Sequence, residues 1–130
     1  KDSTYNLYEN LKIPNFMIFP GSETKLLKGL ELGCSGIISA ICNVTAPIAK
    51  RVFDDFINKK KQTYNEKLCE IRKVFDKNNL ISGLHSFLSF EDKKYKVVVP
   101  PLSLLSESQE KQMMLELKKL DFFPEKNIAA

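Results

Sequence analysis

The chain has 130 residues, of which 43% are hydrophobic and 28% charged, as in an ordinary soluble globular protein. Its 20 basic and 16 acidic side chains leave a formal charge of +4, and the basic residues are spread along the sequence. This mild excess, with no aromatic residues interleaved in the Lys59-Lys60-Lys61 run, disfavours nucleic-acid binding.

Cysteine and histidine usage excludes two further classes of site. The three cysteines show no CxxC spacing, which favours reduced, buried thiols, and a single histidine makes a zinc site improbable. Neither a signal peptide nor an apolar run long enough to cross a membrane is present. We therefore expect a cytoplasmic protein without a metal site.

The first part of the chain is predicted to contain a short helix and an apolar strand. The helix covers Tyr5–Leu11, and Ser3 or Thr4 is a natural N-cap for it. Pro14 closes the connection to a strand at Phe16–Phe19.

An amphipathic helix and a second strand follow. The helix covers Thr24–Leu32, and Gly33 sits where a helix C-terminus favours a residue with positive φ. The strand covers Gly36–Asn43. Two nearly all-apolar strands joined by an amphipathic helix are typical of a parallel sheet that is covered on its helix side. In such folds ligands bind at the edge where the strands end, and polar residues collect there: Ser22, Glu23, Ser39 and Asn43.

The rest of the chain is predicted to be mainly helical. Thr45 fits an N-cap, with Pro47 in the first turn of a helix that continues to about Asn58. The remaining segments are helices at Tyr64–Lys77 and Gly83–Phe90, a loop or extended segment at Glu91–Pro101, and a last helix that begins at a capping box of Ser106 and Gln109. Two complete strands cannot make a stable covered sheet, so we expect this chain to be the C-terminal half of something larger.

Four short motifs stand in a familiar order. They are Lys1-Asp2-Ser3-Thr4; Pro20-Gly21-Ser22-Glu23; Gly36-Ile37-Ile38-Ser39 continuing through Asn43 to Pro47; and Pro100-Pro101-Leu102 before the capped helix. In this order and at these spacings, the chain resembles the C-terminal part of the dihydrodipicolinate synthase and N-acetylneuraminate lyase family. The resemblance covers essentially all 130 residues.

This resemblance implies a fold and an activity. The fold is α/β, the C-terminal part of a TIM (β/α)8 barrel with strands six to eight in residues 1–60, followed by a C-terminal helical extension in residues 61–130. The activity is that of a pyruvate-dependent class I aldolase, which adds or cleaves a 2-oxo acid without a metal or an organic cofactor. The implied partners are pyruvate, a small aldehyde or 2-oxo sugar acid, the N-terminal half of the barrel, and further copies in a homotetramer.

The same resemblance assigns the catalytic residue. Lys1 would attack the ketone of pyruvate and form an imine, which is an electron sink for making or breaking the adjacent carbon–carbon bond. A free lysine has a pKa of about 10.4, so burial or a neighbouring cation must lower the pKa until the amine is partly neutral.

Five residues would bind substrate by this resemblance. Gly21 would allow close approach to the backbone, and Ser22 lies in the same turn. Glu23 would bind hydroxyls or an amine of the second substrate. Ser39 would reach the same pocket, and the Ile38 carbonyl would face the lysine amine. Read without the resemblance, Glu23 is a favourable charge near a helix N-terminus and Ser39 a polar group satisfied by backbone, and for these two both interpretations stay open.

Two departures from the family pattern leave alternatives open. The residues before Lys1, which include the family's carboxylate-binding turn and proton-relaying tyrosine, are not in this sequence. Leu80-Ile81-Ser82-Gly83 stands where many dihydrodipicolinate synthases have Asn-Pro-x-Pro, and the Pro20–Glu23 turn also fits a sugar-acid aldolase, such as one acting on 2-keto-3-deoxygluconate. The rival from another class is a non-catalytic helical interaction or oligomerisation module. It would keep the hydrophobic pattern of Leu68, Ile71, Phe75 and Leu117 and would not need Lys1.

Overall fold

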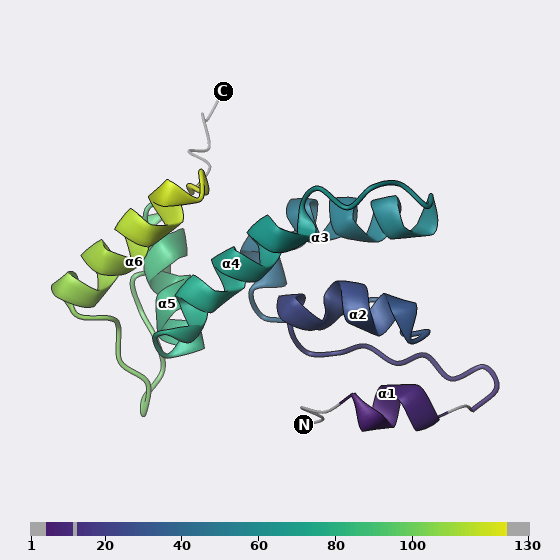
Figure 1. The fold of residues 1–130 in the computed structure, drawn as a ribbon. Coiled ribbons are helices and arrows are strands. Elements are labelled where there is room, and N and C mark those ends of the chain that lie inside the picture. Colours follow the sequence, from purple (N-terminus) through teal and green to yellow (C-terminus); the bar gives the residue numbers. More distant parts are fainter. Residues whose placement is uncertain (1–4, 12, 125–130) are drawn as a thin grey trace. The chain divides into compact units, whose positions relative to one another are not determined.

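The computed structural model describes residues 5–11 and 13–124, and these residues form helices joined by irregular segments (Figure 1). The chain divides into two compact units, residues 1–69 and 70–130. The helices are α1 (Asn6–Asn10), the 3₁₀ helix η1 (Glu23–Lys25), α2 (Leu26–Glu31), α3 (Cys42–Ile57), α4 (Asn65–Asp76), α5 (Leu80–Leu88), the 3₁₀ helix η2 (Lys93–Tyr95) and α6 (Glu107–Lys119). Among the described residues, no helix combines the length and apolar character needed to cross a bilayer.

The core of the first unit lies between α2 and α3, which run side by side (Figure 1). Leucines at i and i+4 share one face of a helix, so Leu26 and Leu30 both point from α2 into this core. They pack with Ala49 and Val52 of α3 and with Leu68 at the start of α4. Burial of these apolar side chains is what holds the short helix α2 in place, because six residues form no stable helix alone.

Gly33 ends α2 as its position in the sequence predicted. Its φ is +91°, a conformation that costs glycine little. The Gly33 amide donates to the Leu30 carbonyl at 3.0 Å, and the Cys34 amide donates to the Gly29 carbonyl at 2.8 Å. This pair of bonds is a Schellman motif, and it satisfies carbonyls that the end of the helix would leave without partners.

The prediction of two strands is wrong, because the described residues of both segments form no strand. Residues 16–19 and 36–39 are irregular. Two backbone bonds join these segments: Ser35 N donates to Ile18 O at 2.9 Å and Ile38 N to Pro20 O at 3.1 Å. An apolar sequence favours a strand, but a strand also needs a continuous hydrogen-bonded ladder with a neighbour, and these two bonds do not make one.

The helix α3 begins one turn earlier than predicted. Its first residue is Cys42, so Asn43, expected at a strand end, lies in its first turn, where its amide nitrogen donates to the Ala40 carbonyl at 2.8 Å. Thr45, expected as the N-cap, lies inside the helix, and its hydroxyl donates to the Ile41 carbonyl at 3.0 Å. Pro47 lies inside α3 rather than at its start. A threonine before a proline favours a helix start, but here Thr45 is buried by its tertiary contacts instead.

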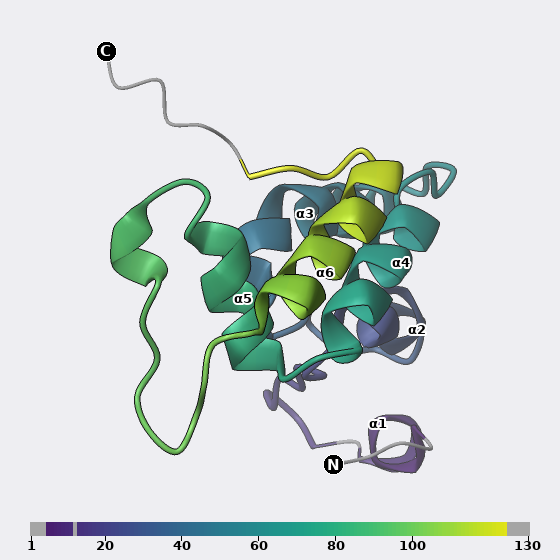
Figure 2. The same ribbon diagram turned by 90° about the vertical axis from the view of Figure 1, so that its left-hand side faces the viewer.

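The second unit packs α5 against α6 around the end of α4 (Figure 2). Its aromatic core joins Phe75 to Phe87 edge-on, with ring centroids 5.7 Å apart, and stacks Phe87 on Phe122 at 5.2 Å. Met113 and Leu117 of α6 are buried in the same unit.

Caps set the starts of both helices in this unit. The Asn79 side chain accepts from the Ser82 amide at 3.1 Å, so α5 starts at Leu80 rather than at the predicted Gly83. The capping box of Ser106 and Gln109 is confirmed at the start of α6.

Candidate functional site

The Glu23 side chain is the centre of a polar group in the first unit. It is 0% exposed, although it lies in the turn at the start of η1. The Ser39 hydroxyl donates to its Oε2 at 2.9 Å, while the Cys42 thiol and the Thr45 hydroxyl approach its Oε1 at 3.4 and 3.3 Å. We call these four residues the Glu23 cluster.

Helix geometry explains why these donors converge. Cys42 and Thr45 are three residues apart, so they share one face of the first turns of α3. Ser39 lies just before this helix, and its carbonyl accepts from the Cys42 amide at 3.2 Å. The Glu23 carboxylate thus lies against the N-terminal end of α3, where the helix dipole favours a negative charge. The Ser39 hydroxyl, the Cys42 thiol and this dipole offset the cost of removing the carboxylate from water, while the single hydrogen of the Thr45 hydroxyl is shared between Glu23 and the Ile41 carbonyl.

The thiol in the cluster is held in its protonated form. Burial, and then the negative charge of Glu23, raises the pKa of Cys42 to about 11. A thiol with this pKa carries almost no thiolate at neutral pH, so Cys42 is a hydrogen-bond donor rather than a nucleophile.

Beside the cluster, the turn at residues 20–23 lies along residues 38–39. A Cβ on Gly21 would sit 3.8 Å from the Ile38 carbonyl oxygen, and the Ile38 side chain is 71% exposed. The Ser22 hydroxyl is within 3.0 Å of the Thr24 hydroxyl in its own turn. The structure therefore brings Gly21 to Ile38 and Glu23 to Ser39, four of the residues that the sequence marked for substrate binding.

The other predicted site residue is Lys1, which lies outside the described residues. In the described part of the chain, no group of three or more His, Cys, Asp or Glu side chains could hold a metal ion. Sequence reasoning missed Cys42 and Thr45. The signal that could have found them is their spacing: Cys42 and Thr45 are three residues apart at the start of α3, so both side chains lie on one face of this helix.

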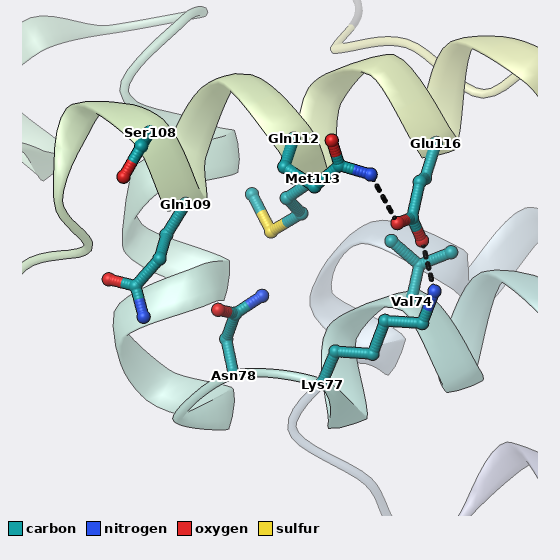
Figure 3. A pocket seen from close by; sticks show the side chains of 8 residues that line it. All are labelled: Val74, Lys77, Asn78, Ser108, Gln109, Gln112, Met113 and Glu116. Atoms are coloured by element: carbon teal, nitrogen blue, oxygen red, sulfur yellow. Dashed lines mark hydrogen bonds and ion pairs between the residues drawn. The ribbon is translucent and has the colours of Figure 1, made fainter.

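A second polar group lies in the second unit, in a hollow of about 230 Å³ (Figure 3). Lys77 at the end of α4 donates to Glu116 at 2.5 Å, and the Gln112 amide donates to the same carboxylate at 2.7 Å. These hydrogen bonds, Lys77 first, lower the pKa of Glu116. Its charge is compensated within the chain, and the apolar side chains of Val74 and Met113 also line the hollow.

Comparison with known proteins identifies the family of this chain. A sequence profile described as the dihydrodipicolinate synthetase family matches residues 1–120. The chain belongs to this family. The resemblance carried by the four motifs is thereby confirmed at the level of the family. No curated protein sequence matches the chain significantly.

Solved structures of dihydrodipicolinate synthetase relatives share the fold. One is YagE, a prophage protein of this family from E. coli K12 in complex with pyruvate, with 21% identity and a TM-score of 0.74 over 84% of this chain and 38% of that one. A monomeric dihydrodipicolinate synthase variant shows 18% identity and a TM-score of 0.72, over 83% of this chain and 37% of that one. Dihydrodipicolinate synthase from Thermotoga maritima shows 19% identity and a TM-score of 0.71, over 82% of this chain and 37% of that one.

These likenesses establish the fold and its extent. The chain spans 37–38% of the length of each of these proteins, so it has the fold of a part of a dihydrodipicolinate synthase. Within the described residues that part is helical, which corrects the α/β class expected from the sequence alone.

Proposed function

We propose that this chain is the C-terminal part of a pyruvate-dependent, imine-forming aldolase of the dihydrodipicolinate synthetase family. The observation that carries the proposal is the apposition of Gly21 with Ile38 and of Glu23 with Ser39, at the ends of two apolar segments. In barrel enzymes, substrates bind where the strands end. The YagE relative was solved with pyruvate, which supports a 2-oxo acid as the substrate class.

The chemistry assigned to Lys1 is a sequence of balanced steps. Its neutral amine adds to the ketone carbon of pyruvate and water leaves, which forms an imine. Transfer of a proton from the methyl carbon to a base gives an enamine, whose carbon bonds to the carbonyl carbon of an aldehyde while the aldehyde oxygen takes up a proton. Water then hydrolyses the imine, releases the product and restores the lysine. In the cleavage direction the same steps run backwards, and the imine itself serves as the electron sink.

The remaining residues would shape the pocket around this imine. Gly21 leaves room at the backbone, the Ile38 carbonyl accepts from the lysine amine, and Ser22 and Ser39 contact the second substrate. The residues that hold the pyruvate carboxylate and relay protons would come from the remainder of the barrel, because the chain spans little more than a third of its structural relatives.

The apolar surface of the first unit supports a barrel that extends beyond this chain. Phe16 and Met17 are 58% and 68% exposed, and Ile38 at the neighbouring segment is exposed as well. Consecutive exposed side chains of this size favour burial against further strands, since large contiguous apolar patches are uncommon on isolated proteins.

The experiment that tests the function is reductive trapping on a complete barrel that contains this chain. The barrel is incubated with pyruvate and borohydride, and peptide mass mapping locates the adduct. We expect a pyruvate-derived mass on the side chain of Lys1. Lys1→Ala should lose both the adduct and turnover yet remain folded by circular dichroism, whereas Lys50→Ala, at an exposed lysine of α3, should keep both.

The alternatives predict different outcomes. A 2-keto-3-deoxy sugar-acid aldolase of the same family would form the same adduct but release pyruvate from 2-keto-3-deoxygluconate. A non-catalytic helical module would form no adduct in the folded barrel. That result would refute the aldolase proposal, but the assignment of the fold would still hold.

A further inference from the structure

A second hollow of the second unit, of about 470 Å³, lies along α6. Phe90, just after α5, and Phe123, just after α6, line it, and their side chains are 51% and 49% exposed. Met114 and Leu115 of α6 line it as well, and Leu115 is also 49% exposed. Apolar side chains that gather on a surface and are rimmed by charge are typical of a site where another protein binds.

The charged residues that line the same hollow are sorted by sign along the helix. Glu107 and Glu110 lie in the first turn of α6, Lys111 follows, and Lys118 lies in the last turn. The lining positions 107, 110, 111, 114, 115 and 118 recur every three or four residues, so they form one stripe on the helix, here called the α6 stripe. Within the described part of the chain, none of these four charged side chains makes an ion pair or a hydrogen bond.

This order makes the α6 stripe complementary to a second copy of itself. In an antiparallel pair related by a two-fold axis that passes midway between positions 112 and 113, Glu107 faces Lys118 of the second copy, and the same pair recurs at the other end. The aliphatic part of Lys111 then covers Met114 of the second copy. A parallel pair would place like charges opposite each other. The sorted charges therefore favour the antiparallel arrangement.

We propose that the α6 stripe is an interface with a second copy of this chain, in which two antiparallel α6 helices pack and Glu107 of each copy forms an ion pair with Lys118 of the other. Burial of Phe90, Leu115 and Phe123 supplies the apolar part of the binding free energy. One pair of 13-residue helices makes a small interface, so the association depends on protein concentration. None of the proposed active-site residues takes part, so this pairing does not depend on the aldolase function.

Zero-length cross-linking tests the pairing directly. A carbodiimide joins a carboxylate to a lysine amine that touches it, and it is applied to a mixture of unlabelled and isotope-labelled complete barrels that contain this chain. Since an α-helix rises about 1.5 Å per residue, Glu107 and Lys118 of one α6 lie about 16 Å apart and cannot be joined within a chain. We expect a Glu107–Lys118 link between one labelled and one unlabelled peptide. A same-chain link from Glu107 to Lys111, one turn away, shows that Glu107 reacts.

Charge reversal shows whether these residues set the pairing. Glu107→Lys leaves only bases at the two ends of the α6 stripe's outer pairs, and Lys118→Glu leaves only acids. Each variant alone should associate at least about tenfold more weakly in sedimentation velocity, because the two-fold symmetry makes one substitution act twice. A mixture of the two variants again has opposite charges at both ends and should associate as the wild type does. Lys119→Glu, the same change at the next exposed lysine, which does not line the hollow, should keep the wild-type affinity.

Each other outcome overturns the proposal. A link from Glu107 to Lys111 without any labelled-to-unlabelled link to Lys118 shows that the two helices do not pair. Links from Glu107 or Lys118 to the N-terminal part of the same barrel show that the rest of the barrel covers the hollow. Equal association of the wild type and both charge variants shows that charge does not set the pairing. Circular dichroism checks the fold of each variant, and if a variant is unfolded, the cross-link in the wild type decides.

Discussion

Burying a carboxylate is costly, and Glu23 shows how one residue is accommodated by donors from a distant part of the sequence. Its partners lie 16 to 22 residues further along the chain, just before α3 and in the first turns of that helix. Local sequence around Glu23 indicates only a favourable charge near a helix start. The environment of this side chain is therefore a tertiary property, and the same holds for the acidity of the thiol beside it.

The titration of Cys42 gives a prediction at this scale. Its pKa in the fold is about 11 against an ordinary value of 9.0, because burial and the Glu23 charge disfavour the thiolate. A raised pKa means that the stabilising contribution is complete below pH 9 and is lost as pH rises through 11. We expect the free energy of unfolding to fall between these pH values, and to fall less steeply in Cys42→Ala.

Alkylation provides a second readout of the same titration. Iodoacetamide should modify Cys42 slowly at pH 8.5 and faster as the pH approaches 11, as followed by peptide mass spectrometry. Glu23→Gln removes one of the two main causes and should speed modification at pH 8.5, while Glu31→Gln should not. Equal rates in all three proteins would show that Glu23 does not influence the thiol.

At the scale of elements, the helix ends that could be predicted are those with local causes. Gly33 ends α2 through bonds within five residues, and Ser106 starts α6 through a bond to Gln109, three residues away. The start of α3 could not be predicted, because Thr45 has a tertiary partner in Glu23. The strand predicted at residues 16–19 is absent because its backbone lacks partners. Its apolar sequence favours a strand, but a strand needs more hydrogen bonds to a neighbouring segment than the described residues supply.

Two helical glycines test how tightly these elements pack. A Cβ on Gly29 would lie 3.0 Å from Pro20 Cγ, whereas one on Gly83 would lie 3.4 Å from the flexible Met113 sulfur. Alanine gains up to about 1 kcal/mol in a helix relative to glycine, but overpacking costs about 1–3 kcal/mol. We expect Gly29→Ala to be less stable than Gly83→Ala by about 1–2 kcal/mol in urea denaturation. The reverse order would mean that the ring of Pro20 moves aside freely.

At the scale of the whole molecule, membership of the dihydrodipicolinate synthetase family could be predicted from four motifs, although no motif alone specifies it. Helices with complete local signals, such as α4 and α6, could also be predicted closely. The candidate site was predicted only in outline: the expectation that Ser39 shares one pocket with the Pro20–Glu23 turn followed from the resemblance, whereas the contacts of Cys42 and Thr45 with Glu23 needed the fold.

The extent of the chain within a barrel leads to a prediction about Met17. In this chain its side chain is 68% exposed, so Met17→Asp should change the free energy of unfolding by no more than about 0.5 kcal/mol. In a complete barrel the same residue would be buried, and an unpaired charge there should cost about 3 kcal/mol or more. Asn15→Asp, which adds the same charge at an exposed turn residue, is the control in both proteins. Equal effects of Met17→Asp in both contexts would contradict burial by the rest of the barrel.

The two backbone bonds from Ser35 to Ile18 and from Ile38 to Pro20 have a further consequence for assembly. They fix how the two segments are offset from each other, and a slip of one residue in a sheet would turn every side chain to the opposite face. A strand that docks on these segments would therefore meet residues whose offset is already set. We expect this chain to act in fragment complementation as the template, so that a separately produced N-terminal half needs only to dock on it.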